Sequence, residues 1–385
     1  MVKPGLWEET RISLTLILPL SSTDKRYEQA HCYAILFVMK IALKITPQRS
    51  TQYAHMTAEL ARPEVLASPL GTMIQTIQPV TLAGQSYLLL ELMADQHDQQ
   101  GQSGLAAQTH EIIAAVIARL GASSEAYEYF DEIGDMPGPL LRPIEPRFAA
   151  FVPLEMAEAR RYKGKTNETF TRVLLNAALF AGDYRDQLTE RLRILDPLCG
   201  GGTTLFLALA AGYDVFGIDT SRQDIDTTAV FVRQYLQSER IHYKEIDERG
   251  RRAGRRYQFE VGPKGDTRHL VLVNGDTNDA AMHLREVAGG PRMHAIVGDL
   301  PYGIQHFAEV SALLSRALPV WEQLLLPGGT LALAWNATRV ERAEMLELFA
   351  QRSQLRLLVD PPYNQFMHPV DRVIKHRDII VAVKA

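Results

Sequence analysis

A glycine-rich segment, residues 193–204 (RILDPLCGGGTT), holds the residues of the chain that are best suited to binding a ligand. An apolar run ends at Asp196, a turn of small residues follows, and a helical pattern begins at Thr203. Glycines at a strand-to-helix turn let a ligand approach the backbone closely, and the first N–H groups of the helix have no partner within it. A second apolar run ends at Asp219, where a carboxylate can accept hydrogen bonds from ribose hydroxyls. Together these features indicate a cofactor that contains adenosine.

Several kinds of site compete for this turn. A phosphate-binding loop of nucleoside triphosphatases requires Gly-Lys-Ser/Thr, and the turn has no lysine. A nicotinamide-binding turn requires a glycine where Leu205 stands, and an uncharged residue would suit a pyrophosphate better than Asp196. A glycine turn without any ligand is the structural alternative. S-adenosylmethionine (SAM) fits best, because it has no phosphate and Asp196 can face its ammonium group.

The pocket for this cofactor is expected to include a third strand end. A further apolar run, residues 271–277 (VLVNGDT), ends near Asp276, whose carboxylate could accept a hydrogen bond from an adenine amino group. A turn residue or helix cap at Asp276 is equally consistent with the sequence. Cys199 is expected to be a small packing residue and not a nucleophile. The residues expected to line the pocket are Asp196, Leu198, Cys199, Gly200, Gly202, Thr203, Asp219, Asp276 and Thr277.

A second motif, residues 295–303 (AIVGDLPYG), follows the fourth predicted strand. An exocyclic base amine is a poor nucleophile because its lone pair is delocalised into the ring. The Asp299 carboxylate and the Leu300 carbonyl could accept both amine hydrogens and so favour a pyramidal nitrogen. Pro301 would hold that carbonyl by fixing φ, and Tyr302 offers a ring on which a base can stack, worth ~1–3 kcal/mol. Methyl transfer would then depend mostly on positioning, after rotation of any paired base out of its helix.

The two motifs resemble those of a family of SAM-dependent amino-methyltransferases. Residues 299–303 (Asp-Leu-Pro-Tyr-Gly) are similar to the family's Asp/Asn-Pro-Pro-Tyr, and residues 196–204 to its Asp-Pro-Phe-Cys-Gly-Ser-Gly-Thr. The form is closest to RNA guanine-N2 methyltransferases of the large-subunit rRNA K/L type and the tRNA guanosine-10 type. The resemblance runs roughly from Arg160 to the C-terminus and implies SAM as cofactor and tRNA or rRNA as substrate. It also implies that Thr166 and Asn167 line the SAM pocket.

Other substrates and another position for the catalytic motif stay open. DNA adenine-N6 or cytosine-N4, a protein glutamine amide, and a non-catalytic SAM- or RNA-binding role are the alternatives. Residues 360–363 (Asp-Pro-Pro-Tyr) match the family tetrapeptide better by letters, but they follow the sixth predicted strand. Because the ligand crevice of a doubly wound sheet lies where the strand order reverses, Asp299 is preferred. The N-terminal region shows no recognisable RNA-capturing module of the kind that the tRNA enzymes usually carry.

The order of elements predicts an α/β fold with a smaller N-terminal α+β domain. Strands are expected over residues 193–196, 214–219, 270–274, 295–299, 329–335, 355–359 and 379–384, with helices between most of them. Such alternation predicts a doubly wound, mostly parallel, seven-stranded Rossmann-like methyltransferase sheet, whose last strand could insert antiparallel. The expected division is an extension over 1–38, a small α+β domain over 39–133 for possible substrate recognition, a proline-rich linker over 134–150, and the methyltransferase domain over 151–385.

Composition sets the outer limits. The chain has 385 residues with 41 Lys+Arg and 45 Asp+Glu, so it is neither a histone-like binder nor a disordered protein. Two cysteines exclude a disulfide framework and a cysteine-rich zinc site, no metal is expected, and a reducing cytoplasm is the expected location. No stretch approaches the ~20 apolar residues that span a membrane. Basic runs at 160–165 and 249–256 flank the proposed cleft in sequence order and could contact phosphates.

Overall fold

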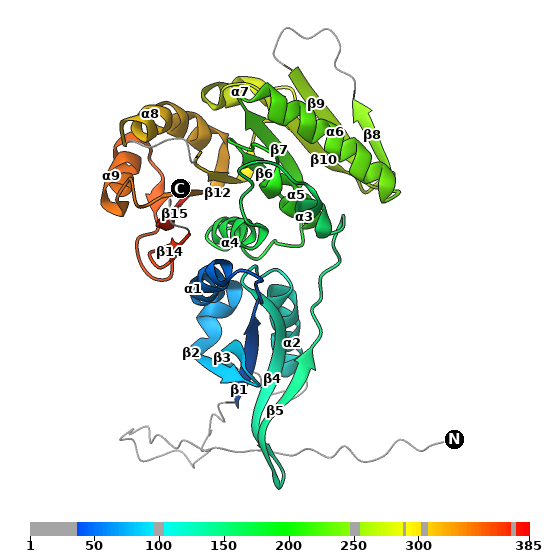
Figure 1. Cartoon of the computed structure of the whole chain (residues 1–385), viewed down its shortest axis with the longest axis vertical. Helices are drawn as coiled ribbons and strands as arrows, with labels where there is room; N and C mark the ends of the chain where they lie inside the picture. Colours follow the sequence, from blue (N-terminus) through cyan, green and yellow to red (C-terminus); the bar gives the residue numbers. More distant parts are fainter. Residues whose placement is uncertain (1–36, 95–103, 247–254, 288–289, 302–306, 371–374) are drawn as a thin grey trace, which may run out of the picture.

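The chain forms two β-sheets with helices packed against them (Figure 1). The computed structural model describes residues 37–94, 104–246, 255–287, 290–301, 307–370 and 375–385. Residues 1–36, which make up nearly all of the expected extension, and Tyr302 lie outside the described residues.

The first sheet is antiparallel and has the strand order β2-β3-β1-β4-β5. Its strands are β1 (Phe37–Ile45), β2 (Ile74–Leu82), β3 (Gln85–Ala94), β4 (Ser123–Ile133) and β5 (Met136–Ile144). Its helices are α1 (Thr51–Ala67), the 3-10 helix η1 (Pro69–Met73) and α2 (Gly104–Ile117). Alternate residues of β1, Ile41 and Leu43, pack with Leu60 and Val65 of α1 in one hydrophobic cluster. The sheet therefore buries one of its faces under the helices.

The segment expected to be a linker is in part a strand of this sheet. Within residues 134–150, β5 pairs antiparallel with β4, so that Pro143 lies opposite Tyr127 and Leu140 opposite Phe130. The prolines that suggested a linker are tolerated because β5 is the edge strand, where one side needs no N–H donor. The expected linker is therefore wrong up to Ile144, and the connection to the second sheet begins after that residue.

The second sheet has ten strands of mixed direction in the order β13-β15-β12-β11-β6-β7-β10-β9-β8, with β14 paired to β15. The α/β class is confirmed and all seven expected strands occur, but the expected count of seven is wrong. The hairpin of β8 and β9 extends the sheet beside β10, and β14 adds to β15. The centre, from β12 to β10, is parallel, and β15 is antiparallel as expected. The strands are β6 (Arg193–Asp196), β7 (Asp214–Asp219), β8 (Tyr243–Ile246), β9 (Arg255–Val261), β10 (Arg268–Asn274), β11 (Met293–Asp299), β12 (Leu325–Asn336), β13 (Arg356–Leu357), β14 (His368–Pro369) and β15 (His376–Val383).

Helices cover the two faces of this sheet with separate hydrophobic clusters. Successive residues of β6, Ile194 and Leu195, belong to different clusters because neighbouring strand residues point to opposite faces. One cluster contains residues of α4, α5 and α6, and the other contains residues of α7, α8 and α9. The helices are α3 (Glu155–Ala159), α4 (Glu168–Leu179), α5 (Thr203–Ala210), α6 (Arg222–Ser238), the 3-10 helix η2 (Thr277–Asp279), α7 (Ala280–His283), α8 (Phe307–Leu324) and α9 (Arg342–Arg352).

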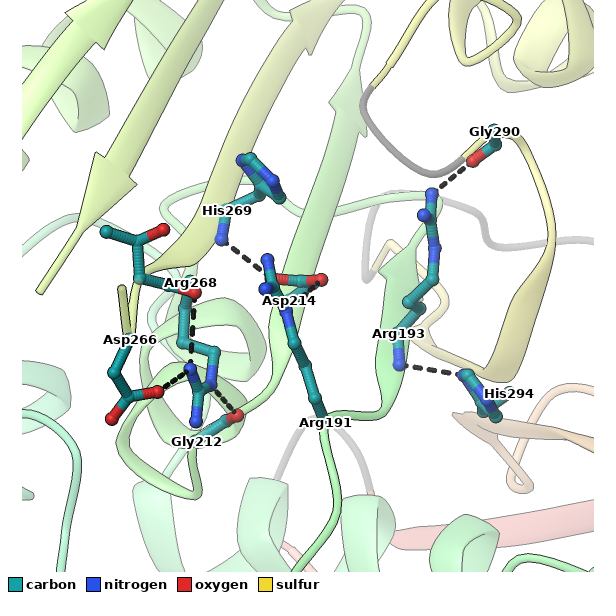
Figure 2. A network of polar contacts seen from close by, with 10 residues as sticks. Arg191, Arg193, Gly212, Asp214, Asp266, Arg268, His269, Gly290 and His294 are labelled. Atoms are coloured by element: carbon teal, nitrogen blue, oxygen red, sulfur yellow. Dashed lines mark hydrogen bonds and ion pairs between the residues drawn. The ribbon is translucent and has the colours of Figure 1, made fainter. Parts of the chain in front are cut away.

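A polar network joins the starts of four central strands (Figure 2). Asp214, which begins β7, accepts hydrogen bonds from the Arg191 guanidinium at 2.8 and 2.9 Å and from the His269 N–H at 2.7 Å. The N–H of Arg193 in β6 donates to Nδ1 of His294 in β11 at 2.9 Å. These contacts fix the strand starts at the edge opposite the glycine turn, so they support the sheet and lie away from the expected site.

The two sheets meet through α1 and α4. Glu64 of α1 is fully buried and accepts hydrogen bonds from the N–H groups of Gly121 and Ala122 at 2.8 and 2.9 Å. It also accepts a bond at 2.7 Å from Nδ2 of Asn176, which belongs to α4. Burial raises the pKa of Glu64, against the effect of these donors. One hydrophobic cluster runs through both parts of the molecule, so the junction is a continuous core.

Candidate active site

Three acidic residues mark the ends of three neighbouring strands. Asp299, Asp196 and Asp219 are the last residues of β11, β6 and β7, which are adjacent in the sheet. From β6 the chain builds the sheet to one side through β7, and later returns to the other side of β6 through β11. The strand order therefore reverses at β6, and ligands of open α/β sheets bind at such a point.

The glycine turn between β6 and α5 leaves room for a ligand at one position. Gly200 and Gly202 have φ angles of 46° and 87°, a region in which residues with a side chain are strained. A Cβ atom at Gly200 would meet nothing within 4 Å, so the space above this residue is open. Gly202 caps α5, which begins at Thr203 as expected.

Asp219 is held in place by the turn and by its own loop. One carboxylate oxygen accepts from the N–H of Gly200 at 2.8 Å, and the other accepts from the N–H of Ser221 at 2.7 Å. Because an ionised carboxylate has about four acceptor positions, two remain for a ligand such as a ribose. The geometry is compatible with the role predicted for Asp219.

Asp196 is the most perturbed acid of the site. Its residue is only 3% exposed, and burial raises the pKa of its carboxyl group to about 7. The Thr204 hydroxyl and the Leu198 N–H, which donates at 3.1 Å, oppose this rise. The carboxylates of Asp219 and Asp299 raise the pKa of Asp196 further, so the three acids lie close enough to influence one another. A cation bound among them would relieve this repulsion.

Tyr162 packs on the glycine turn, a contact that no local sequence pattern indicates. A Cβ atom at Gly201 would lie 2.4 Å from the Tyr162 ring, so Gly201 has no side chain because the ring occupies that space. The Tyr162 hydroxyl shares a hydrogen bond of 2.8 Å with Oγ1 of Thr203. Arg160 lies over the same ring at 5.6 Å from its centre. The Thr203 side chain, expected in the pocket, is therefore buried under Tyr162 instead.

Three further residues of the expected pocket have structural contacts. Cys199 is buried, and burial raises the pKa of its thiol well above the ordinary value, in keeping with a packing role. Asp276 is exposed and caps η2, where one carboxylate oxygen accepts from Asn278 N at 2.9 Å and Nδ2 at 2.7 Å. Oγ1 of Thr277 accepts from Nε1 of Trp321 at 2.9 Å in the core, so this side chain does not face a ligand.

Asp299 is fixed from two sides. Thr166 donates its hydroxyl to Oδ2 of Asp299 at 2.8 Å, and the guanidinium of Arg377 lies 3.7 Å from the same oxygen. Burial raises the pKa of Asp299, while Arg377 and Thr166 lower it. The N–H of Leu300 donates to the carbonyl of Ala334 in β12 at 2.9 Å, which fixes the peptide after Asp299. Tyr302, the expected stacking residue, lies outside the described residues.

The segment before α4 has a different role from the one expected. Asn167 caps α4, because its Oδ1 accepts the N–H of Phe170 at 3.1 Å. Thr166 contacts the predicted catalytic carboxylate. That both side chains also line a SAM pocket stays a prediction.

Arg377 is the second site residue that sequence reasoning missed. A signal was present, because an antiparallel strand begins at the edge where its parallel neighbours end. In the register of the sheet, Asp299 lies beside Ala334, Ala334 beside Ile379, and Asn336 beside Arg377. A cation at the start of the last strand is therefore expected near the acid that ends the fourth.

Other candidate functional features of the chain do not belong to this group of three acids. Asp360 is exposed and follows β13, which three strands separate from β6, so the order supports the preference for Asp299. Within the described ranges, no group of three His, Cys, Asp or Glu side chains could hold a metal ion. Nor is any described helix long and apolar enough to cross a membrane. A pocket of about 410 Å³ lies between the two sheets, lined by Phe148 and Arg172 among others, away from these acids.

Comparison with known proteins gives only distant likenesses. No family model and no curated protein matches the chain. Among solved structures, TrmN from Thermus thermophilus aligns over 90% of this chain and 100% of its own, with 12% identity and a TM-score of 0.41. An rRNA methylase from Streptococcus thermophilus covers 52% of this chain and 92% of its own, with 17% identity and a TM-score of 0.30. Magnesium protoporphyrin IX methyltransferase from Synechocystis, with bound SAM, covers 60% and 90%, with 13% identity and a TM-score of 0.35. Likenesses at these scores are too weak to assign an activity.

Proposed function

We propose that the chain is a SAM-dependent methyltransferase that acts on an exocyclic amine of a nucleobase, with guanine N2 of tRNA or rRNA as the first candidate. The observation that carries the proposal is the meeting of Asp196, Asp219 and Asp299 at the ends of three adjacent strands, beside the open space above Gly200. A turn without a ligand would not require three acids at one point.

The charge of this site suits SAM. The cofactor carries positive charge on its sulfur and on its ammonium group, and burial of Asp196 among other carboxylates favours a bound cation. Asp219 can accept from ribose hydroxyls, and the exposed carboxylate of Asp276 can reach an adenine amine while it caps η2. When bound, SAM supplies a methyl group on a sulfonium that a nucleophilic amine can attack.

The residues around Asp299 supply the positioning of that amine. The carboxylate of Asp299 and the main-chain oxygen of Leu300 are suited to accept one amine hydrogen each. The first acceptor is held by Thr166 and Arg377, and the bond from Leu300 N to Ala334 anchors the peptide that precedes the Leu300 carbonyl. Preset acceptors lower the cost of orienting the amine, and orientation is the main requirement of this transfer.

RNA is favoured by the resemblance of the two motifs and by nearby charge. Arg161 and Lys163 are exposed and lie a few residues before Thr166, which contacts Asp299. Cations in this place can bind phosphates of a nucleic acid whose base reaches Asp299.

Two measurements test the proposal. Calorimetry of the purified protein with SAM should give saturable binding, and absence of binding would overturn the proposal. Incubation with methyl-labelled SAM and total RNA should then put label into material that ribonuclease destroys, with N2-methylguanosine identified by mass spectrometry. Label lost to deoxyribonuclease or protease would move the substrate to DNA or a protein amide. SAM binding without transfer to any of these would favour a non-catalytic role.

A further inference from the structure

The last strand of the sheet places a buried guanidinium behind Asp299. Arg377 is the second residue of β15, and its guanidinium lies 3.7 Å from Oδ2 of Asp299, with side-chain exposures of 5% and 18%. The Phe170 ring of α4 lies beneath the guanidinium, 4.5 Å from it at the ring centre. Because the side chain is both buried and stacked, its position is fixed by the fold.

We propose that Arg377 is a positioning residue which, with Thr166, keeps Asp299 ionised and oriented, so that its carboxylate accepts hydrogen bonds from the substrate amine. This inference rests on the proposed amine methyltransferase activity. An ionised carboxylate only accepts, whereas a protonated one also carries an O–H that would face the amine hydrogens. A buried acid without a partner tends to protonate, and burial does raise the pKa of Asp299. Arg377 is the larger of the two influences that oppose this rise, and Thr166 is the other.

The charged neighbours of this pair come from several elements. Asp196 ends β6, and the negative charge of Asp299 raises the pKa of its carboxyl group. A negative charge on Asp196 in turn disfavours ionisation of Asp299. Tyr53 of α1 interacts with Arg377 from the first sheet. His368 of β14 packs on Phe170 at 5.0 Å between ring centres, and burial lowers its pKa to about 4, so it is uncharged near neutral pH. Among the described residues, Arg377 is the cation that lies 3.7 Å from Asp299, and its guanidinium remains charged at any working pH.

The first test measures the protonation of Asp299 directly in the protein alone. Carboxyl NMR of aspartate-labelled protein, with Asp299→Asn to assign the signal, should show the Asp299 midpoint rising by about one pH unit or more in Arg377→Met. Arg377→Lys should restore most of the shift, because it returns a positive charge. A matched control is Arg342→Met, which breaks the buried contact from Arg342 to Asp378, 2.7 Å long and one residue along β15. That control should leave the Asp299 midpoint unchanged.

The second test follows methyl transfer against pH. Arg377→Met should shift the acid limb of the pH profile of kcat to higher pH. It should reduce kcat at neutral pH about tenfold, with little change in the KM for RNA. Its rate should recover at higher pH, which a merely structural defect would not produce. Arg342→Met should lose stability without moving the profile.

The outcomes separate the two proposals. An unchanged Asp299 midpoint in Arg377→Met refutes the positioning role, whatever the enzyme transfers. A shifted midpoint in a protein whose natural form transfers no methyl group refutes the proposed function alone. If Arg377→Met does not fold, Arg377→Gln carries the same expectation, and Asp299→Asn combined with Arg377→Met should fold because both charges are gone.

Discussion

Asp196 is the residue of the site whose charge responds most to pH near neutrality. Burial raises its pKa from 3.8 to about 7 in the folded protein. Its neutral form therefore favours folding at low pH, and this contribution is lost as the pH rises through about 7. The free protein is destabilised at the pH at which the carboxylate can bind a cation, so the site is arranged for a positively charged ligand.

We therefore predict that SAM binds more tightly at about pH 7.5 than at about pH 5.5, by up to tenfold, because binding to Asp196 requires its ionised form. Calorimetry at the two pH values measures the effect. The Asp196→Asn variant should bind SAM weakly and with almost the same affinity at the two pH values. Because this variant lacks the titrating carboxyl group, it shows how much of the pH effect comes from titration of SAM itself. Equal affinity of the natural protein at both values would exclude Asp196 from the ammonium site.

Asp299 and Asp360 allow the two copies of the acid-X-proline-tyrosine pattern to be compared. Replacement of Asp299 by Ala should leave SAM affinity nearly unchanged and reduce transfer by ~10²-fold or more, because hydrogen bonds made mainly in the transition state are lost. Asp360→Ala is the matched control, since Asp360 is exposed, and should transfer normally. Calorimetry and a labelled-methyl assay give both quantities. The opposite result, with loss of transfer only in the Asp360 variant, would show that methyl transfer depends on Asp360 and would refute the role proposed for Asp299.

The acids of this site were predictable from local patterns in the sequence, whereas no local pattern identified the residues that hold them. Asp196, Asp219 and Asp299 each follow an apolar run, which is a local pattern. Tyr162 and Arg377 contact the turn and Asp299 from 39 and 78 residues away. Such contacts depend on strand order and register, and no local pattern specifies either.

Among the elements, the buried strands were the most predictable. The five parallel strands of the centre, β12, β11, β6, β7 and β10, have both faces covered, so they appear as continuous apolar runs, and all five occur where they were expected. β5 was missed because Pro137, Pro139 and Pro143 indicate a break, and only its edge position makes them acceptable. β8 and β9 form a hairpin at one edge of the second sheet, where apolar patterning is weak.

At the turn between β6 and α5, we predict a steric coupling between Gly201 and Tyr162. Gly201→Ala would put a Cβ atom 2.4 Å from the ring and should lower the free energy of unfolding by ~1–3 kcal/mol, with weaker SAM binding. In a protein that already carries Tyr162→Ala, the Gly201→Ala change should cost much less stability, because the ring that the new Cβ atom would meet is gone. Urea unfolding of the four proteins of this cycle measures the coupling. Additive losses would show that the cost of Gly201→Ala does not come from a clash with the Tyr162 ring.

Over the whole molecule, the position of the first sheet relative to the active site depends on one continuous core. α1 contacts α4, and Thr166, which lies one residue before the N-cap of α4, donates to Asp299. Tyr53 of α1 interacts with Arg377. A nucleic acid bound by the first sheet would therefore be held at a fixed distance from Asp299, the acid proposed to be catalytic. Glu64 provides a way to test whether the two parts behave as one unit.

Glu64→Ala removes the acceptor of the buried N–H groups of Gly121 and Ala122 and one of the two acceptors of Asn176 Nδ2, and should lower the free energy of unfolding by about 3 kcal/mol or more. Trp321 and Trp335 are 0% and 1% exposed in the second sheet's core, so their fluorescence follows the unfolding of that sheet. If the junction couples the two parts, the fluorescence midpoint in urea must fall together with the far-ultraviolet circular dichroism midpoint. Glu59→Ala, an exposed position on the same helix, should change neither by more than about 0.5 kcal/mol. A variant in which only the circular dichroism transition moves would show that the first sheet unfolds independently, and that it cannot hold a substrate at a fixed distance from Asp299.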